Sequence, residues 1–389
     1  MLIAVNTRLL LKDKLEGIGW FTYESLKRIT KNHPEHQFLF LFDRPFSEDF
    51  IFSDNISPVI VGPPSRHPFL WYWWFEQSLP KVFHKYEPDL FLSPDGFLSL
   101  SAGYPAGMKK FKSLAVIHDL NFEHYPQDIP FLARKYYKKY FPHYAKKADR
   151  IATVSEYSKQ DISKFYKISP EKIDVVYDGA NEVFKASPNP LLQRGLKVSP
   201  EGGDLEGAVP YFLFIGALSP RKNVARLLQA FDEFKKSESS KMKLIIAGEK
   251  MFKTNEIETV YNKMQFKNDV IFTGRLGIAD LKDIMANAFS LVFVPYFEGF
   301  GIPILEAMYC DVPVITSNVT SMPEVAGNAA LLVDPFSVDS IKDGMLRIYK
   351  DEALRKQLIL NGQKQREKFS WDKTAEKLWK CIEKTEAPS

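Results

Sequence analysis

Short apolar runs rich in Val, Ile, Leu and Phe recur along this 389-residue chain, and a helical pattern follows each of them. Continuous apolar runs that alternate with helices are typical of parallel strands buried on both faces of a sheet. The pattern therefore predicts the α/β class, with two doubly wound parallel sheets. The expected strands are LIAVNTRLLL, HQFLFLF, DLFLSP, SLAVIHDL, RIATVS and KIDVVYDG in the first half, and YFLFIG, KLIIAG, DVIFTG, SLVFVP and VPVITS in the second.

The length of the chain favours two domains, since single domains commonly have about 100 to 200 residues. Between Ser187 and Pro210 the sequence is rich in Pro and Gly and has no clear period, which is typical of a connection. We expect an N-terminal domain at 1–190, a linker at 191–209 and a C-terminal domain at 210–368. Apolar residues from Phe369 to Ile382 recur at helical spacing, so residues 369–389 are expected to form a helix with one buried face.

The amino-acid composition limits which binding partners and which cellular compartment are expected for the protein. Lys and Arg total 52 against 48 Asp and Glu, and this small excess gives no reason to expect nucleic acid as a partner. Cys310 and Cys381 match no metal-binding spacing or disulfide framework, which favours a reducing compartment. The first residues lack the features of a signal peptide, and no apolar run is long enough to span a bilayer. We expect a cytoplasmic protein.

The segment EGFGIPILEA, from Glu298 to Ala307, places two acids around the expected start of a helix. Its glycines permit close approach of the backbone, and Pro303 suits the first helical position. Free N–H groups there suit a phosphate, whereas ionised Glu298 and Glu306 accept hydrogen bonds from hydroxyl groups. A nucleotide sugar has phosphates between two hydroxyl-bearing ends. The alternative is that Glu306, expected in the first turn, only complements the helix dipole, and that Glu298 is a solvated loop residue.

Arg221 and Lys222 form a second candidate feature, because they follow the strand FLFIG and precede a helix. Cations at a helix N-terminus oppose the helix dipole, and a bound diphosphate would relieve that conflict. The alternative is a solvated pair of cations near the start of a helix.

Two other strand ends carry candidate residues. Gly17 and Gly19 follow the first strand, but Thr22 stands where a dinucleotide fingerprint has its third glycine, so a tight strand-to-helix turn is the alternative. His118 and Asp119 directly follow a strand and can bind sugar hydroxyls or transfer a proton. A buried structural histidine is the alternative there.

Residues 131–147, FLARKYYKKYFPHYAKK, combine basic residues with tyrosines at spacings of four. A basic, aromatic amphipathic helix binds anionic lipid surfaces, and the alternative is a solvated helix interrupted at Pro142. The aromatic cluster from Trp71 to Phe75 either contacts sugars or lipid or belongs to the core, and the core is the favoured interpretation. No Asp-x-Asp and no clustered ligand set occurs, so no metal is expected.

Taken together, these segments resemble glycosyltransferase family 4, the retaining nucleotide-sugar-dependent enzymes with the GT-B fold. The resemblance covers nearly the whole chain, and its most specific motif is the Glu-x7-Glu element from Glu298 to Glu306. It implies two facing Rossmann-like domains, with the acceptor on the N-terminal side, the donor on the C-terminal side, and a last helix that returns to the N-terminal domain. The matching segments are GIGWFTYESL, EQSLP, PDLFLSP, VIHDLNFEHYP, ADRIATVSEYSKQDI, FIGALSPRKN, TGRLGIADLKDIMANA, YFEGFGIPILEAMYCDVPVITSNVTSMPEVAGNAALLVDP and FSW.

The resemblance also implies roles for individual residues. Glu306 would bind the ribose hydroxyls, Glu298 the transferred sugar, and Lys222 with Arg221 the diphosphate. Many family members have a cation directly after the glycine of this strand; here it is Ala217, and Arg221 is expected to compensate. The other implied donor contacts are Gly17 and Gly19 near the phosphates, His118 near the donor sugar, backbone amides near Phe300, Gly301 and Ile302, and Gly274 with Arg275 at the base pocket.

A retaining hexosyltransferase is the function that the resemblance implies. It would move a hexose of mannose or glucose type from a nucleoside-diphosphate sugar to a glycan or lipid-linked acceptor, in polysaccharide or glycolipid synthesis. GALSPRKN with VIHDLNFEHYP is most similar to the mannosyltransferase-like branch of bacterial group 1 glycosyltransferases, which favours GDP-mannose over a UDP-sugar as co-substrate, with no cofactor. The alternatives are a GT-B nucleotide-sugar epimerase and a non-catalytic sugar-nucleotide-binding subunit. The expected location is the cytoplasm, with or without peripheral contact at the inner face of an anionic membrane.

Overall fold

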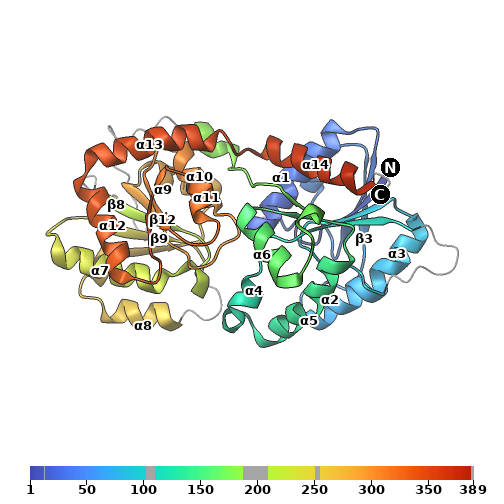
Figure 1. The fold of residues 1–389 in the computed structure, drawn as a ribbon, viewed down its shortest axis with the longest axis horizontal. Helices are drawn as coiled ribbons and strands as arrows, with labels where there is room; N and C mark the ends of the chain where they lie inside the picture. Colours follow the sequence, from blue (N-terminus) through green and yellow to red (C-terminus); the bar gives the residue numbers. More distant parts are fainter. Residues whose placement is uncertain (13, 102–109, 187–208, 250–254, 387–389) are drawn as a thin grey trace. The chain divides into compact units, whose positions relative to one another are not determined.

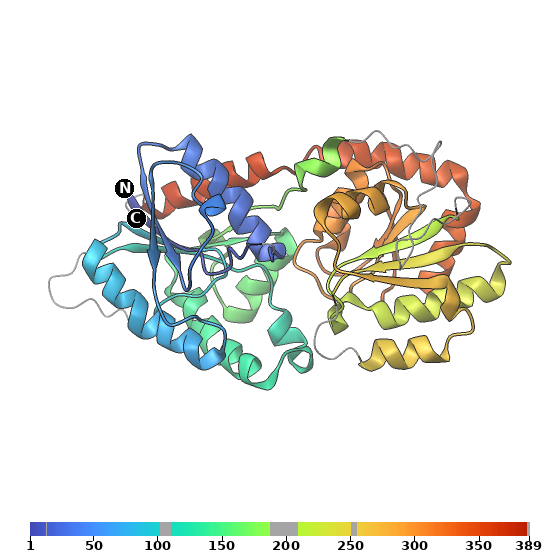
Figure 2. The same ribbon diagram turned by 180° about the vertical axis from the view of Figure 1, so that it is seen from behind.

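The computed structural model describes residues 1–12, 14–101, 110–186, 209–249 and 255–386. The chain divides into two compact units, one formed by Met1–Asp178 with Trp371–Ser389 and the other by Gly179–Ser370. Each unit has a parallel sheet covered by helices (Figures 1 and 2). The linker expected at 191–209 lies almost entirely outside the described residues.

The first unit has a parallel sheet with the strand order β3-β2-β1-β4-β5-β6-β7. The strands are β1 (Leu2–Asn6), β2 (Gln37–Phe42), β3 (Ile56–Ile60), β4 (Leu90–Ser93), β5 (Lys112–Val116), β6 (Arg150–Thr153) and β7 (Ile173–Val175). The helices are α1 (Gly17–Asn32), α2 (Pro68–Trp73), α3 (Leu79–Tyr86), α4 (Asn121–His124), α5 (Phe131–Lys147), α6 (Glu156–Tyr166) and α14 (Trp371–Glu386).

Both faces of this sheet are buried, which explains why its strands are continuous apolar runs. Side chains alternate between the faces of a strand, so Ala4 of β1 lies on one face and Ile3 and Val5 lie on the other. All three are fully buried. Ala4 belongs to a large aromatic core that also contains Trp74 and Phe75.

The helix expected at 369–389 is found as α14, which packs against α1, β5 and β6 of the first unit. Thr374 donates a hydrogen bond from Oγ1 to the carbonyl oxygen of Tyr177 at 2.6 Å. The Trp379 ring stacks on the His33 ring with a centroid separation of 3.6 Å. The first unit is therefore built from two parts of the chain that lie on either side of the second unit in sequence.

The second unit has a parallel sheet with the strand order β10-β9-β8-β11-β12-β13. The strands are β8 (Tyr211–Ile215), β9 (Lys243–Ala247), β10 (Val270–Gly274), β11 (Ser290–Phe293), β12 (Val314–Ser317) and β13 (Ala330–Val333). The helices are α7 (Val224–Ser237), α8 (Asn255–Lys263), α9 (Ile278–Ala286), α10 (Ile302–Tyr309), α11 (Met322–Ala326), α12 (Val338–Lys350) and α13 (Glu352–Arg366).

Each sheet has a topological switch point, where the chain stops adding strands on one side and begins on the other. In the first unit β2 and β3 lie on one side of β1, and β4 lies on the other. In the second unit β9 and β10 lie on one side of β8, and β11 lies on the other. Open α/β sheets bind ligands outside the carboxyl ends of the two strands that flank this point. The loops after β1, β4, β8 and β11 are therefore the expected positions of a binding site.

The fold class predicted from the sequence is confirmed, and every predicted strand is present within the described residues. Two edge strands, β3 and β13, were missed. β3 contains Pro58 and has exposed side chains, so it lacks the continuous apolar run of the buried strands. β13 has four residues, too few to give a clear pattern.

Two other expectations need correction. The interruption at Pro142 is wrong, because α5 continues through it from Phe131 to Lys147. The buried side chains of Phe141 and Tyr144 hold this part of the helix against the core, which outweighs the backbone hydrogen bond lost at a proline. The aromatic cluster from Trp71 to Phe75 is divided: Trp74 and Phe75 are in the core, whereas Tyr72 and Trp73 are exposed.

Candidate active site

The switch point of the second unit holds three of the predicted site residues. Arg221 and Lys222 lie in a short 3₁₀ turn after β8, and Glu298 lies in the loop after β11. Lys222 donates a hydrogen bond from Nζ to Oε2 of Glu298 at 2.6 Å, and Arg221 donates to the same oxygen. The structure thus joins the predicted cations and one predicted acid in a single ion cluster, which was not expected from the sequence.

The charges in this cluster determine the protonation of Glu298. Burial by itself raises the pKa of the Glu298 carboxyl, but the positive charges of Arg221 and Lys222 outweigh it and hold the pKa below its ordinary value. The Lys222 ammonium also lies 4.7 Å from the centroid of the Phe293 ring, a cation–π contact. An anion that enters this cluster has to compete with an ionised Glu298 for both cations.

The loop from Glu298 to Gly301 leads directly into α10. Gly301 has a φ of +102°, and a Cβ atom there would lie 2.7 Å from Cε of Met322. Ser321 donates from Oγ to the carbonyl oxygen of Glu298 at 2.8 Å, which fixes the loop from the other side. The first N–H groups of α10 have no partner within the helix and carry its partial positive charge. This end of α10 suits an anion.

Glu306 lies deeper in α10 than expected. The helix begins at Ile302, so Pro303 is its second residue and Glu306 is its fifth, beyond the first turn. Glu306 is 8% exposed, and its carboxyl group has no hydrogen-bond or ion-pair partner among the described residues. Burial raises its pKa to about 8. A carboxyl group that is buried and unpaired in this way is suited to ligand hydroxyls, since it donates a hydrogen bond when protonated and accepts when ionised.

The other residues of the second unit that were predicted to contact the nucleotide sugar lie near strand ends or are buried in the loop that precedes α10. Gly274 ends β10 with a φ of +70°, and its carbonyl oxygen accepts a hydrogen bond from the N–H of Gly248 at 2.9 Å. Arg275 approaches Glu249, with 3.9 Å between Nη1 and Oε2. Phe300 is buried against the Phe369 ring. Gly274 and Arg275 therefore lie at the same carboxyl edge of the sheet as the ion cluster.

His118 follows β5 in the first unit, as predicted, and its Nε2 atom lies 2.9 Å from the carbonyl oxygen of Pro94. The Phe21 ring packs edge-on against the imidazole at 5.0 Å. Burial lowers the pKa of His118, against the opposing effects of the Pro94 carbonyl, Asp119 and Asp95, so the ring is neutral at pH 7. Because a carbonyl oxygen only accepts, Nε2 carries the proton and Nδ1 is left as an acceptor.

The glycine loop expected at Gly17 and Gly19 is not a loop. Gly17 is the first residue of α1, and Gly19 lies inside its first turn. A Cβ atom at Gly19 would come within 3.3 Å of the carbonyl oxygen of Leu9, whereas one at Gly17 would meet nothing within 4 Å. Gly19 thus permits close packing of the segment that precedes α1. This packing is sufficient to explain why residue 19 is a glycine, and no ligand is needed for the explanation.

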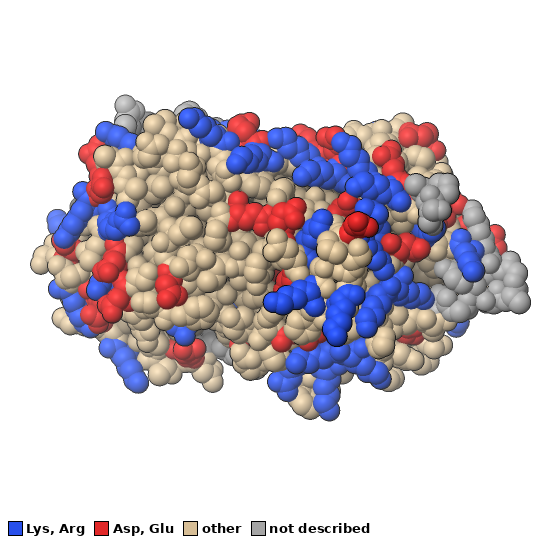
Figure 3. Space-filling view, viewed as in Figure 1, with Lys and Arg blue, Asp and Glu red and all other residues tan. Residues whose placement is uncertain are grey.

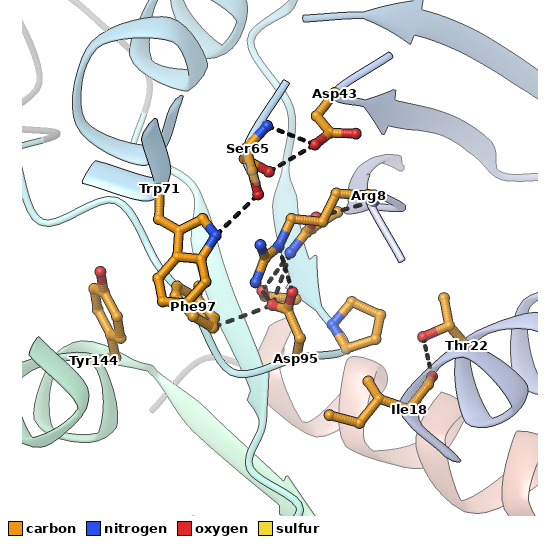
Figure 4. A network of polar contacts seen from close by, with 12 residues as sticks. Arg8, Ile18, Thr22, Asp43, Ser65, Trp71, Asp95, Phe97 and Tyr144 are labelled. Carbon is orange, nitrogen blue, oxygen red and sulfur yellow. Dashed lines mark hydrogen bonds and ion pairs between the residues drawn. The ribbon is translucent and has the colours of Figure 1, made fainter. Parts of the chain in front are cut away.

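Sequence reasoning missed one charged pair at the switch point of the first unit. Arg8, after β1, donates from Nε to Oδ2 of Asp95, after β4, at 2.7 Å (Figure 4). Both side chains are buried. The signal available was weak, because it consisted only of charged residues just beyond two apolar runs.

No group of three or more His, Cys, Asp or Glu residues in the described part of the chain is arranged to hold a metal ion. No helix in the described ranges is long and apolar enough to cross a membrane.

Known proteins resemble this chain in sequence and in fold. The profile described as "Glycosyl transferases group 1" matches residues 201–365, and the profile "Glycosyltransferase Family 4" matches residues 16–183. O-antigen chain mannosyltransferase B of Escherichia coli is 30% identical over 265 residues, which are 67% of each protein. O-antigen chain mannosyltransferase RfbU of Salmonella typhimurium is 30% identical over 219 residues, which are 56% of each protein.

The fold has a counterpart among solved structures. The crystal structure of Anabaena HepE in complex with UDP and glucose aligns with a TM-score of 0.73 at 16% identity, over 98% of this chain and 99% of that one. The two parallel α/β units and this similarity identify the GT-B fold. The two profiles match successive parts of the chain, residues 16–183 and 201–365, and one relative is 30% identical across two thirds of it. The chain therefore belongs to the group 1, family 4 glycosyltransferases.

Proposed function

We propose that this glycosyltransferase moves a mannosyl group, with retention of the anomeric configuration, from GDP-mannose to a hydroxyl group of a glycan or lipid-linked acceptor in polysaccharide synthesis. The observation that carries the proposal is the ion cluster of Arg221, Lys222 and Glu298 beside the start of α10, with the unpaired carboxyl of Glu306 on the same helix. The mannosyltransferase names of the two relatives support mannose over glucose. A UDP-sugar is the alternative donor, as in the HepE complex.

Each charged group has a part in the proposed reaction. The bond between the anomeric carbon and the donor diphosphate breaks, and Arg221, Lys222 and the N-terminus of α10 stabilise the charge that develops on the departing nucleoside diphosphate. A bond forms between the anomeric carbon and the acceptor oxygen on the same face, and the acceptor proton passes to a donor phosphate oxygen. No carboxylate attacks the sugar in this scheme.

The other predicted residues bind and orient the donor. Glu306 binds the ribose hydroxyls, and Glu298 binds hydroxyls of the transferred sugar once the diphosphate has taken its place beside the cations. His118 offers Nδ1 as an acceptor to a sugar hydroxyl. Backbone groups from Phe300 to Ile302 contact the sugar and the phosphates. Gly274 and Arg275 border the base, and Gly17 and Gly19 lie near the phosphates.

A panel of nucleotide sugars tests the donor. We expect GDP-mannose to raise the Tm more than UDP-glucose or UDP-galactose, because a ligand that binds only the folded state stabilises it. Incubation of the best donor with α-mannoside acceptors is expected to give a glycoside whose anomeric signals in NMR match an α-linkage. Release of an altered sugar without any acceptor would indicate an epimerase instead. Donor binding with neither transfer nor hydrolysis would indicate a binding subunit.

We further propose that the first unit contacts an anionic membrane through α5 and α2. Phe69 and Trp73, one helical turn apart on α2, are 66% and 48% exposed, and Phe131 at the start of α5 is 55% exposed. The Trp71 ring of α2 stacks on the Tyr137 ring of α5, so the two helices are neighbours. Figure 3 shows Lys and Arg side chains gathered over this part of the first unit. The basic residues of α5 are Arg134, Lys135, Lys138, Lys139, Lys146 and Lys147.

This arrangement suits a lipid surface because exposed aromatic side chains enter the interface while cations approach anionic headgroups. We expect co-sedimentation with phosphatidylglycerol vesicles that weakens at high salt and is lost in the double variant Lys138→Glu/Lys139→Glu. The matched control is the double variant Lys364→Glu/Lys368→Glu, at the end of α13 and in the turn that follows it, which carries the same charge change in the second unit. Equal sedimentation of the two double variants would refute the membrane contact.

A further inference from the structure

The two units place charged residues at equivalent points of their sheets. In the second unit the switch point between β8 and β11 carries the cluster of Lys222 and Glu298. In the first unit the switch point between β1 and β4 carries the pair of Arg8 and Asp95. Both pairs join the loop after the first strand of a unit to the loop after the strand beside it. The position of Arg8 is thus one where open α/β sheets bind ligands.

Asp95 holds Arg8 in an unusual way, through one nitrogen only. The Oδ1 atom of Asp95 already accepts hydrogen bonds from Asn6 Nδ2 at 2.8 Å and from Ser93 Oγ at 3.1 Å. It lies 3.3 Å from the N–H of Phe97 as well. Only Oδ2 is left for Arg8, and it binds Nε. The guanidinium group therefore lacks the two parallel bonds that arginine and carboxylate groups often form.

The terminal nitrogens of Arg8, Nη1 and Nη2, have no hydrogen-bond partner among the described residues, although the side chain is only 8% exposed. Charged donors that are largely buried are usually paired in folded proteins. These two nitrogens lie side by side in one plane, and they are not among the fully buried side-chain atoms without a partner, so solvent or a ligand can reach their N–H groups. Two parallel donors of this kind can bind two oxygen atoms that a ligand carries on adjacent carbon atoms.

The surrounding residues keep the guanidinium group in place. Its central carbon lies 4.4 Å from the centroid of the Phe97 ring and 5.8 Å from that of Trp71 (Figure 4). The Trp71 ring is itself fixed by a hydrogen bond from Nε1 to the carbonyl oxygen of Ser65 at 2.9 Å. Gly96, next to Asp95, has a φ of +80° and packs so closely on β5 that a Cβ atom would lie 3.1 Å from a backbone oxygen. A fixed donor of this kind is prepared for a ligand before the ligand arrives.

We propose that Arg8 binds two adjacent hydroxyl oxygens of the acceptor saccharide, with Asp95 as the residue that positions it. A neutral ligand is favoured over a phosphate or a carboxylate, because Asp95 already balances the charge of Arg8 and would repel a second anion. The inference rests on the proposed function, in which the second unit holds the donor. It gives the first unit a specificity-determining residue for the acceptor.

The test compares Arg8→Lys with Arg150→Lys in the full chain. The first variant keeps a cation beside Asp95 but removes the planar pair of donors. Arg150 is the matched control, because it also binds an aspartate of the first unit, Asp174, through Nε, at the opposite edge of the sheet. The probes are GDP-mannose as donor and methyl α-mannoside or an α-mannobioside as neutral acceptor. The readouts are the KM for each substrate, the partition of the mannosyl group between acceptor and water, and the Tm.

We expect Arg8→Lys to raise the KM for the acceptor by roughly tenfold or more, the effect of losing hydrogen bonds to a charged donor. In Arg8→Lys we expect a larger share of the mannosyl groups to be transferred to water. The KM of this variant for GDP-mannose is expected to stay within about twofold of the wild-type value. In Arg150→Lys the KM values for both substrates are expected to stay within the same range. An unchanged acceptor KM, or a lower Tm with both KM values unchanged, would overturn the assignment of Arg8. A wild-type protein that used no nucleotide sugar at all would overturn the proposed function together with it. Preference for a phosphorylated mannoside, abolished in Arg8→Lys, would overturn the choice of a neutral ligand.

Discussion

The Nζ atom of Lys222 lies 2.6 Å from Oε2 of Glu298, and Arg221 donates a hydrogen bond to the same oxygen. The two cations proposed for the diphosphate and the acid proposed for the sugar are thus bound to one another. A diphosphate that binds the two cations has to displace Glu298 from them. Variants of Glu298 are therefore expected to bind a diphosphate more tightly and to transfer the sugar more slowly.

Replacement of Glu298 by Gln is expected to tighten the binding of free GDP several-fold, because the cations lose their internal partner. The same change is expected to lower kcat by at least about tenfold, since the contact with the transferred sugar is weakened. Isothermal titration with GDP and steady-state kinetics measure the two effects. Weaker GDP binding together with an unchanged kcat would contradict the proposed roles.

Replacement of Lys222 by Ala is expected to lower kcat/KM by roughly a hundredfold or more, because a buried cation that stabilises the leaving diphosphate is removed. Lys236→Ala is the control, since Lys236 lies on α7 of the same unit and pairs with exposed Glu233. We expect the control to retain wild-type kinetics. Circular dichroism checks that both variants are folded, and a folded Lys222→Ala protein with normal turnover would exclude the assignment.

Glu306 gives a pH-dependent prediction. Its pKa of about 8 in the folded protein exceeds the ordinary value of 4.5, so between these values the unfolded chain releases a proton that the folded protein keeps. Ionisation of Glu306 therefore destabilises the fold as the pH rises from about 4.5 to 8. Glu306→Gln lacks this titration, and its free energy of unfolding relative to wild type is expected to rise by at least roughly 1 kcal/mol across that range. Urea unfolding at pH 5, 6.5 and 8 measures the difference, and a difference independent of pH would show that burial does not raise this pKa.

The proposed contact of Glu306 with ribose gives a separate prediction. Wild-type protein is expected to bind GDP more tightly than 2′-deoxy-GDP by roughly tenfold, since a buried carboxyl left without its hydroxyl partner is unfavourable. Glu306→Ala is expected to bind the two nucleotides about equally. Competition binding measures both ratios. Discrimination that persists in Glu306→Ala would place the ribose elsewhere.

Gly248 tests the packing beneath the ion cluster. A Cβ atom there would lie 1.9 Å from the carbonyl oxygen of Gly216, a backbone atom next to the loop that carries Lys222. Gly248→Ala is therefore expected to reduce the free energy of unfolding by about 2 kcal/mol or more. The control is Gly277→Ala, because a Cβ atom at Gly277 has its nearest neighbour at 3.6 Å, an ordinary contact. Equal stability of the two variants in urea would contradict this steric argument.

The fold was predictable because its cause is local. Strands buried on both faces need continuous apolar runs, and such runs are visible without any knowledge of partners, as in Ile3 to Val5 of β1. The start of helix α10 was predictable to within one residue for the same reason, since glycines in a turn and a proline have preferred places at a helix start. The positions of the acids were less predictable, because Glu306 is the fifth residue of the helix and lies beyond its first turn. The edge strand β3 was missed because most of its side chains are exposed, so it lacks a continuous apolar run.

The pairing of charges was not predictable, because it depends on residues far apart in sequence. Arg8 and Asp95 are 87 positions apart, and only the strand order β1-β4 brings them together. The sequence is compatible with two anionic partners for Lys222, a bound ligand and Glu298, and its pattern does not distinguish between them. Gly17 and Gly19 lie within α1 and not in a loop, and the sequence alone does not show whether a glycine serves packing, as Gly19 does, or the approach of a ligand.

Helix α14 has a consequence for the order in which the chain folds during synthesis. Its buried residues Trp371, Leu378 and Ile382 complete the core of the first unit, yet they are made after the whole of residues 179–370. The second unit is continuous and can close its core as soon as it leaves the ribosome, while the first unit waits for a helix translated later. A chimaera that exchanges the first unit between related enzymes therefore has to carry residues 371–386 along with residues 1–178, or the transplanted unit will lack one side of its core.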